Sequence, residues 1–189
     1  MLSVANLSQL PADNGAEVAF AGRSNSGKSS TLNAITAQGK LARTSRTPGR
    51  TQLINYFGLE DDRYLVDLPG FGYAKVSHTV RDDWHQLLDS YLSNRESLRG
   101  LVLVTDIRHA PTDFDCDLMK WTGEIGLPLL LLLNKADKFN RGPALQIIAK
   151  VKAEIANQSW THVSVQLFSA LRKQGIDEAR LWLDERLYP

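Results

Sequence analysis

The sequence predicts an α/β fold: a doubly wound, mostly parallel six-stranded sheet with one antiparallel edge strand. Three observations support this prediction. A glycine-rich loop separates a short apolar run from helix-forming residues near the N-terminus. The runs 101–104 and 127–133 are almost continuously apolar, which is typical of parallel strands covered on both faces. Strand-like and helix-like segments then alternate to the end of the chain, as in doubly wound α/β domains.

The remaining elements follow in order along the chain. Residues 1–15 contain Pro11 and an Asp-Asn-Gly turn signal, and we expect an N-terminal strap of low order there. We expect strands at 16–22, 52–59, 63–68, 100–107, 127–133 and 163–168, with the second and third forming an antiparallel hairpin around an acidic turn. We expect helices at 28–37, 79–93, 113–123, 143–157 and 175–187. Without linkers or repeats, residues 1–189 are expected to form a single domain.

Composition excludes several classes of protein. The 189 residues are 43% hydrophobic and 23% charged, as in an ordinary globular protein, and the net charge is +1. One cysteine, Cys116, leaves no internal disulfide and fits a reducing cytoplasm. No signal peptide is recognisable, and the most apolar run is too short to cross a bilayer. We therefore expect a cytoplasmic protein with no membrane partner. We also expect a monomer.

The glycine-rich loop Gly22-Arg23-Ser24-Asn25-Ser26-Gly27-Lys28-Ser29 fits the phosphate-loop pattern G-x-x-x-x-G-K-[S/T]. Its glycines let phosphate oxygens approach the backbone, and its N–H groups and the helix N-terminus attract anions. Lys28 would supply a cation for the β- and γ-phosphates, and Ser29 a hydroxyl for Mg²⁺. The alternative is an ordinary glycine-rich turn with a surface lysine.

A basic, polar segment follows the first helix. Between residues 22 and 59 there are six basic residues and no acidic one: Arg23, Lys28, Lys40, Arg43, Arg46 and Arg50. Residues 40–51 contain Pro48-Gly49 and are expected to form a loop. The charge either serves the bound phosphates alone or also forms a surface for RNA phosphates.

Two further motifs stand at the ends of predicted strands. Asp67-Leu68-Pro69-Gly70 places a carboxylate where the second acidic group of a Mg²⁺ site is expected. Asn134-Lys135-Ala136-Asp137 fits N/T-K-x-D, whose aspartate can accept hydrogen bonds from guanine N1–H and the 2-amino group. Adenine has neither donor, so such a site would select guanine strongly. An ATP-using P-loop kinase or ATPase is the rival interpretation.

Together these motifs resemble a known family. The chain is similar to the EngB (YihA/YsxC) family of bacterial ribosome-assembly GTPases, within the P-loop GTPase superfamily. The resemblance covers almost the whole chain and rests on GRSNSGKSS (22–30), TPGRTQLINYF (47–57), DLPGFGYAKV (67–76), DIRHAPTDFD (106–115), NKAD (134–137) and Phe168-Ser169-Ala170. The family commonly has threonine at the position of Asn134, whereas asparagine is usual in GTPases at large.

The resemblance implies roles for the matching positions. Ser29 and Thr51 would be Mg²⁺ ligands, Asp67 would act on the metal indirectly, and Lys28, Thr51 and Gly70 would be catalytic. The residues implied to contact GTP or GDP are Gly22, Arg23, Ser24, Asn25, Ser26, Gly27, Lys28, Ser29, Gly49, Arg50, Thr51, Gln52, Leu53, Asp67, Leu68, Pro69, Gly70, Asn134, Lys135, Ala136, Asp137, Phe168, Ser169 and Ala170.

The resemblance also implies a partner, and one residue of the chain bears on the rate of hydrolysis. The family acts on the large (50S) ribosomal subunit and is needed for normal growth and cell division, which favours an RNA-binding basic loop here. Phe71 stands where Ras-like proteins have the glutamine that orients the attacking water. We therefore expect slow GTP hydrolysis, completed by a partner or by K⁺ held near Asn25. The alternative is a ribosome-binding assembly factor that binds GTP or GDP without physiologically relevant turnover.

Overall fold

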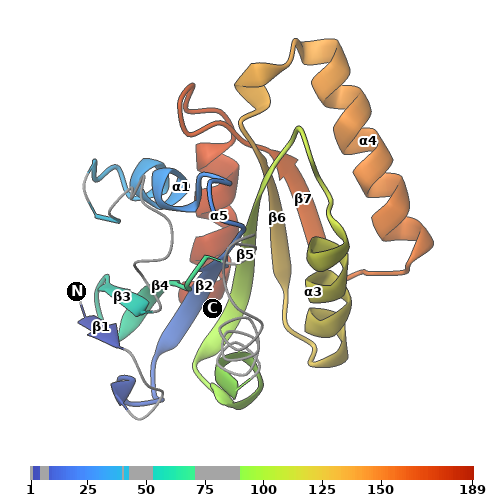
Figure 1. Ribbon diagram of the computed structural model, residues 1–189. Helices are drawn as coiled ribbons and strands as arrows, with labels where there is room; N and C mark the ends of the chain where they lie inside the picture. Colours follow the sequence, from blue (N-terminus) through green and yellow to red (C-terminus); the bar gives the residue numbers. More distant parts are fainter. Residues whose placement is uncertain (1, 5–8, 40, 43–52, 71–89) are drawn as a thin grey trace, which may run out of the picture.

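The computed structural model describes residues 2–4, 9–39, 41–42, 53–70 and 90–189, and structural statements concern these residues. Seven strands form one sheet (Figure 1) in the order β1-β3-β4-β2-β5-β6-β7. They are β1 (Leu2–Val4), β2 (Ala16–Ala21), β3 (Ile54–Gly58), β4 (Arg63–Asp67), β5 (Leu98–Asp106), β6 (Leu129–Asn134) and β7 (Val163–Leu167).

The mostly parallel α/β sheet and its antiparallel hairpin are confirmed. Strands β4, β2, β5, β6 and β7 pair in parallel, and β3 runs antiparallel to β4. The expected number of six strands is wrong, because β1 adds a seventh that pairs antiparallel with β3. The antiparallel strand β3 therefore lies one position inside the edge. The segment expected to be a poorly ordered strap contains this strand, and Val4 is buried with 2% exposure.

Four long helices cover the two faces of the sheet (Figure 1): α1 (Lys28–Ile35), α3 (Asp113–Glu124), α4 (Arg141–Asn157) and α5 (Ile176–Leu187). A short 3₁₀ helix, η2 (Ala136–Lys138), follows β6. These bounds agree with the sequence prediction within two residues. Of the helix expected at 79–93, residues 79–89 lie outside the described part of the chain, and residues 90–94 are helical. In the described chain, no helix combines the length and apolarity needed to span a membrane.

Strands β5 and β6 lie between two apolar clusters. Leu101, Leu103 and Leu131 face the cluster that contains residues of α3 and α4. Val102 and Leu132 face the cluster that contains residues of α1 and α5. The continuous apolar runs are thus explained by burial on both faces. The carboxyl ends of parallel strands lie on the same side of a sheet. The loops that follow β2, β4, β5, β6 and β7 are therefore brought together there.

Candidate nucleotide-binding site

The phosphate loop connects β2 to α1 at the carboxyl ends of the parallel strands. Ser26 N–H donates to the Arg23 carbonyl over 3.0 Å, and Thr31 N–H donates to the Gly27 carbonyl over 2.8 Å. Asn25 has a φ of 67° and Gly27 a φ of 98°. The loop thus leads directly into the N-terminus of α1. A turn of this kind before a helix N-terminus is the arrangement that binds phosphate in α/β folds.

Both motif glycines are required by close contacts. A Cβ on Gly22 would lie 2.5 Å from the Val104 carbonyl oxygen and 2.8 Å from Ser26 Oγ. A Cβ on Gly27 would lie 2.3 Å from Nδ2 of Asn134, and the positive φ at Gly27 is itself unfavourable for other residues. The loop therefore packs against β5 and against the end of β6.

The carboxylate expected near the phosphates lies beside the motif lysine. The Lys28 ammonium group forms an ion pair with the Asp67 carboxylate, and each side chain is 11% exposed. Gly70 lies against the loop, because a Cβ there would be 3.6 Å from the Gly22 carbonyl oxygen and 3.7 Å from Ser24. The Asp67–Gly70 segment and the phosphate loop are thus one cluster, as the sequence predicts.

The N-K-x-D segment is tied to the phosphate loop by two hydrogen bonds. Asn134 Nδ2 donates to the Ser26 carbonyl over 2.9 Å, which links the two motifs directly. Lys135 Nζ donates to the Asn25 carbonyl over 2.6 Å. Ser26 and Asn134 are both 3% exposed, so the first bond is buried. Any ligand held by one loop is therefore positioned relative to the other.

Asp137 is oriented by the loop after β7. Ser169 Oγ donates to Asp137 Oδ1 over 2.5 Å and accepts from the Arg172 N–H over 3.1 Å. The Ala136 N–H donates to the Phe168 carbonyl over 3.0 Å. Ser169 is fully buried and therefore restricts the Asp137 carboxylate on one side. Residues 136 and 137 thus contact residues 168 and 169, and their role in holding guanine stays a prediction.

Asp106, at the end of β5, is a site residue that motif reasoning did not assign. Its carboxylate accepts from Lys135 Nζ over 2.8 Å and from Arg108 Nη2 over 2.6 Å. Burial acts to raise the pKa of Asp106, but the hydrogen bonds from Arg108 and Lys135 outweigh it and hold that pKa well below its usual range. The carboxylate therefore stays ionised and fixes the Lys135 stem beside the loops. The signal available in the sequence was an acidic residue at the end of a predicted strand.

Some of the expected contact residues cannot be placed, and one has a buried side chain. Gly49, Arg50, Thr51 and Gln52 lie outside the described residues, as do Lys40, Arg43, Arg46 and Phe71. The side chain of Leu68 is 1% exposed and belongs to the apolar core, so it is not available to a ligand.

The described residues fit a nucleotide with Mg²⁺. The Ser26 hydroxyl is buried and finds no hydrogen-bond partner among the described residues. Ser29 stands half-buried in the first turn of α1, and Asp67 ends β4 beside Lys28. Hydroxyl and carboxylate oxygens are the protein ligands that Mg²⁺ prefers. Ser29 could thus bind Mg²⁺ directly, with Asp67 nearby.

A phosphate loop joined to an N-K-x-D loop on a doubly wound sheet defines the class of P-loop GTPase-like domains. Residues 17–135 match the model of a family described as 50S ribosome-binding GTPase. Two relatives are named probable GTP-binding protein EngB, from Xanthomonas campestris pv. campestris (strain 8004) and Xanthomonas oryzae pv. oryzae (strain PXO99A). Each is 52% identical over 179 residues, covering 95% of this chain and 86% of the relative. The chain belongs to the EngB family of GTP-binding proteins.

Solved structures agree with this family and fold. A crystal structure of a probable GTP-binding protein EngB has a TM-score of 0.72 and 25% identity, covering 91% of this chain and 98% of that chain. The crystal structure of Era in complex with MgGDPNP and nucleotides 1506–1542 of 16S ribosomal RNA has a TM-score of 0.68. Its identity is 20%, and the match covers 92% of this chain and 57% of that chain. At that identity, the likeness to Era concerns the fold.

Proposed function

We propose that this protein is a GTP-binding, slowly GTP-hydrolysing switch that assists assembly of the large ribosomal subunit in the cytoplasm. The observation that carries the proposal is the buried Asn134–Ser26 hydrogen bond of 2.9 Å, which joins the phosphate loop to the base-selecting loop. This bond makes one site from two motifs more than a hundred residues apart. Family membership supports the same conclusion.

The roles of the chain's own residues follow from this arrangement. The phosphate-loop N–H groups and Lys28 hold the β- and γ-phosphate oxygens and stabilise the charge that develops as water attacks the γ-phosphate. Asp67, now paired with Lys28, is released when the lysine turns to the phosphates. Mg²⁺, held by Ser29 and Thr51, would neutralise the phosphate oxygens, with Gly70 reporting the γ-phosphate. Phe71 offers no hydrogen-bonding group to orient the water, which favours slow turnover.

Guanine selection is assigned to Asp137, with Ser169 fixing one of its carboxylate oxygens. The test is Asp137→Asn, which should weaken GTP binding about 100-fold or more and favour xanthosine triphosphate. Asp117→Asn, an exposed change on α3, is the matched control. Calorimetric titration with GTP, ATP and xanthosine triphosphate measures both variants. Unchanged GTP affinity in Asp137→Asn, or equal affinity for ATP in the parent protein, would contradict the assignment.

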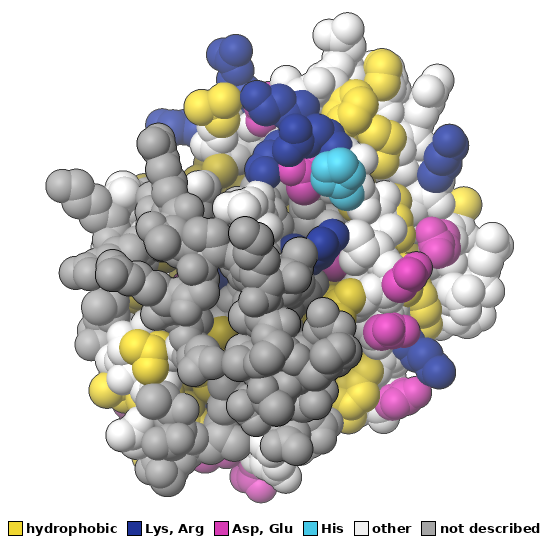
Figure 2. Space-filling view, viewed as in Figure 1, with side chains coloured by type: hydrophobic (Ala, Val, Ile, Leu, Met, Phe, Trp, Pro, Cys, Tyr) yellow, Lys and Arg dark blue, Asp and Glu magenta, His cyan; other side chains and the backbone are white. Residues whose placement is uncertain are grey.

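The proposed partner is ribosomal RNA of the large subunit. Besides the expected contribution of residues 40–51, basic side chains gather on the face of the molecule shown in Figure 2. Exposed basic residues stand on the loops that follow β2, β5, β6 and β7: Arg23, Arg108, Lys138, Arg172 and Lys173. Clustered lysine and arginine around a ligand site suit the phosphates of RNA, and such binding weakens steeply with salt.

Co-sedimentation with large ribosomal subunits tests the partner. We expect binding that depends on whether GDP, a GTP analogue or no nucleotide is present. Arg172→Glu with Lys173→Glu should reduce binding. Lys120→Glu with Lys150→Glu, which changes two exposed charges on α3 and α4, should not. Equal losses in both double variants would leave only a general charge effect and would contradict a specific face.

A binding module without relevant turnover is the second candidate, and Phe71 is the observation that favours it. Phosphate release measured with and without large subunits separates the two. Stimulation by subunits supports the switch, whereas unchanged rates under every condition support the module. The same assay in K⁺ and Na⁺ buffers tests the cation expected near Asn25, and equal rates would exclude a role for K⁺.

A further inference from the structure

Strand β7 forms the edge of the described sheet opposite β1. The His162 carbonyl accepts from the Leu129 N–H over 3.0 Å, and the Phe168 N–H donates to the Leu133 carbonyl over 3.0 Å. In a parallel strand, every second residue directs both its N–H and its C=O to the strand on one side, and the residues between direct theirs to the other side. Even-numbered residues of β7 therefore bond to β6, and Val165 directs its N–H and C=O away from the sheet.

This edge lacks the features by which proteins usually prevent strand addition. The strand reads Val-Ser-Val-Gln-Leu, without charge or proline, and no register shift accompanies its pairing with β6. Charged side chains, proline and bulges are the common protections of an edge strand. An unprotected edge can accept the backbone of another extended segment.

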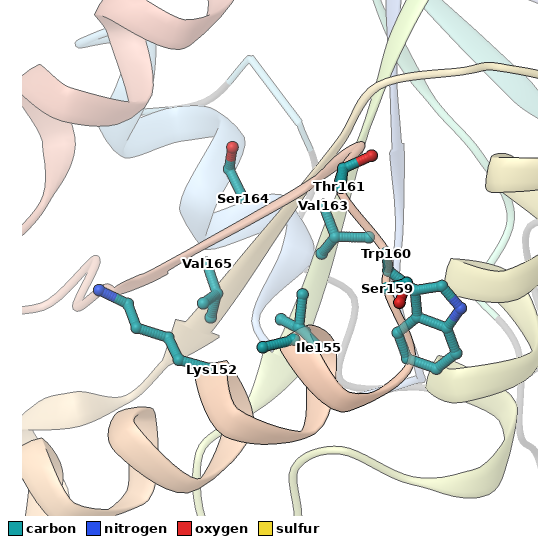
Figure 3. Close-up of a pocket in the computed structure, with 9 residues that line it drawn as sticks. Lys152, Ile155, Ser159, Trp160, Thr161, Val163, Ser164 and Val165 are labelled. Carbon is teal, nitrogen blue, oxygen red and sulfur yellow. The ribbon is translucent and has the colours of Figure 1, made fainter.

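A hollow of about 660 Å³ lies beside this edge (Figure 3). It lies between β7 and the C-terminal part of α4, and its apolar lining includes Ile155, Trp160, Val163 and Val165. Lys152 is the charged residue of the lining, and it forms no ion pair within the described part of the chain. Trp160 is half-buried, so part of its ring is available for contact.

We propose that the edge of β7 and this hollow, the β7–α4 groove, bind an extended peptide segment of a partner protein. The peptide pairs its backbone with Val165 and inserts an apolar side chain next to Ile155 and Trp160. A carboxylate of the peptide faces Lys152. Backbone pairing supplies affinity, and the alternate side chains supply specificity.

The composition of the groove favours a peptide over RNA. A nucleic-acid site would need several cations along a backbone path, whereas this lining carries one lysine. An acidic or carboxylate-bearing segment with apolar residues at alternate positions complements both the lysine and the apolar wall. The groove adds a protein partner to the proposed RNA contact and does not depend on bound nucleotide.

The experiment uses the full chain with GDP and a dye-labelled, end-blocked peptide Glu-Val-Thr-Val-Thr-Val. Fluorescence anisotropy should give saturable binding. The same peptide with alternate amides N-methylated should bind about tenfold more weakly, because two backbone hydrogen bonds are lost. Hydrogen exchange at the Val165 amide should slow when the plain peptide binds. Equal binding of both peptides, no saturable binding, or unchanged exchange at Val165 would overturn the proposal.

Two variants locate the binding. Val165→Pro removes the outward N–H without removing a bond to β6, and it should lower affinity about tenfold. Lys152→Glu should lower affinity about threefold, whereas Lys150→Glu on the same helix should have no effect. Because Val165→Pro could fail to fold, circular dichroism checks that this variant is folded. The comparison of Lys152→Glu with Lys150→Glu does not depend on that variant, and equal affinities of these two would overturn the carboxylate contact. A concentration-dependent dimer lost in Val165→Pro would overturn the peptide assignment and make a second copy the occupant.

Discussion

At the amino end of β2 a buried carboxylate is surrounded by protein donors, whereas at the carboxyl ends of the strands the charged groups have partners that a ligand can replace. Glu17 is fully buried and accepts from Tyr91 over 2.7 Å and from Tyr56 over 3.1 Å. Arg95 adds bonds of 3.0 Å from Nε and 2.5 Å from Nη2. We call these four residues the Glu17 network. It joins β2, β3 and the segment before β5.

The electrostatics of the Glu17 network keep its donors in place. Burial, reinforced by the charge of Glu17, raises the pKa values of Tyr56 and Tyr91, so both phenols stay protonated. Burial acts to lower the pKa of Arg95, but the hydrogen bonds and charge of Glu17 outweigh it and raise that pKa. The two phenols and the Arg95 guanidinium therefore keep the protons that they donate to Glu17.

The opposite end of the sheet has a different balance. Lys28 and Asp67 pair with each other, and the buried Ser26 hydroxyl has no hydrogen-bond partner among the described residues. Phosphate oxygens can replace Asp67 as the partner of Lys28, because charge-assisted hydrogen bonds to phosphate are strong. The contrast teaches that buried charge stabilises the fold at one end and is reserved for a ligand at the other. The following predictions test this division.

Glu17→Ala gives the largest expected effect. It leaves the Arg95 side chain, which is 7% exposed, without its buried partner, and the free energy of unfolding should fall by ~3–5 kcal/mol. Urea denaturation followed by circular dichroism measures it. Glu96→Ala removes an exposed glutamate next to Arg95 in the chain and should change stability by less than about 0.5 kcal/mol. Equal effects of the two changes would show that the network does not carry the stability.

Lys28→Ala is the corresponding change at the ligand end. GDP affinity should fall about 100-fold, because charge-assisted bonds to phosphate are lost. The free energy of unfolding without nucleotide should fall by less than in Glu17→Ala, since the Lys28 and Asp67 side chains are each 11% exposed, whereas those of Arg95 and Glu17 are 7% and 1% exposed. Calorimetric titration and thermal unfolding measure both quantities. A melting shift on adding GDP that survives unchanged in Lys28→Ala would contradict the proposed role.

The ligand end could be predicted from the sequence because its chemistry is written in contiguous motifs. The phosphate loop and residues 134–137 each place their groups by local geometry at the end of a strand. The Glu17 network could not be predicted in this way. Its partners lie 39 to 78 residues from Glu17, and a glutamate that begins an apolar run gives no sign of them.

The same argument explains two smaller omissions. Asp106 binds Lys135 from 29 residues away, so its role appears only when β5 and β6 are paired. Strand β1 has three residues, too few for an alternating pattern to be recognised. Its place depends on the free edge of β3, which only the assembled sheet provides.

Asn134→Ala tests the link between the two nucleotide-binding loops. It removes the buried bond from Asn134 Nδ2 to the Ser26 carbonyl and leaves that oxygen unpaired. The free energy of unfolding should fall by ~1–3 kcal/mol, and GTP affinity should fall about tenfold because the loops are no longer held together. Asn157→Ala, at the last residue of α4, serves as the exposed control. GTP affinity equal to that of the parent protein would contradict the link.

Asp13→Asn has the smallest expected effect and brings pH into the comparison. Asp13 accepts from the N–H groups of Glu96 over 2.9 Å and Ser97 over 2.7 Å. Burial acts to raise its pKa, but hydrogen bonds from Ser97 and Glu96 outweigh it and lower that pKa. A carboxylate with a depressed folded-state pKa stabilises the protein above the unfolded-state value of about 4 and loses this contribution as pH falls through the folded-state value.

The variant should therefore lose about 1 kcal/mol at pH 7, where the carboxylate bonds are present, and less near pH 3. Urea denaturation at several pH values measures the difference between Asp13→Asn and the parent protein. The change also weakens the contact of 3.4 Å between Arg95 and Asp13, but Arg95 keeps its ion pair with Glu17. The loss of stability should therefore stay small. A difference that grows as pH falls would have the wrong sign for this mechanism and would remove Asp13 from the account of that end of the sheet.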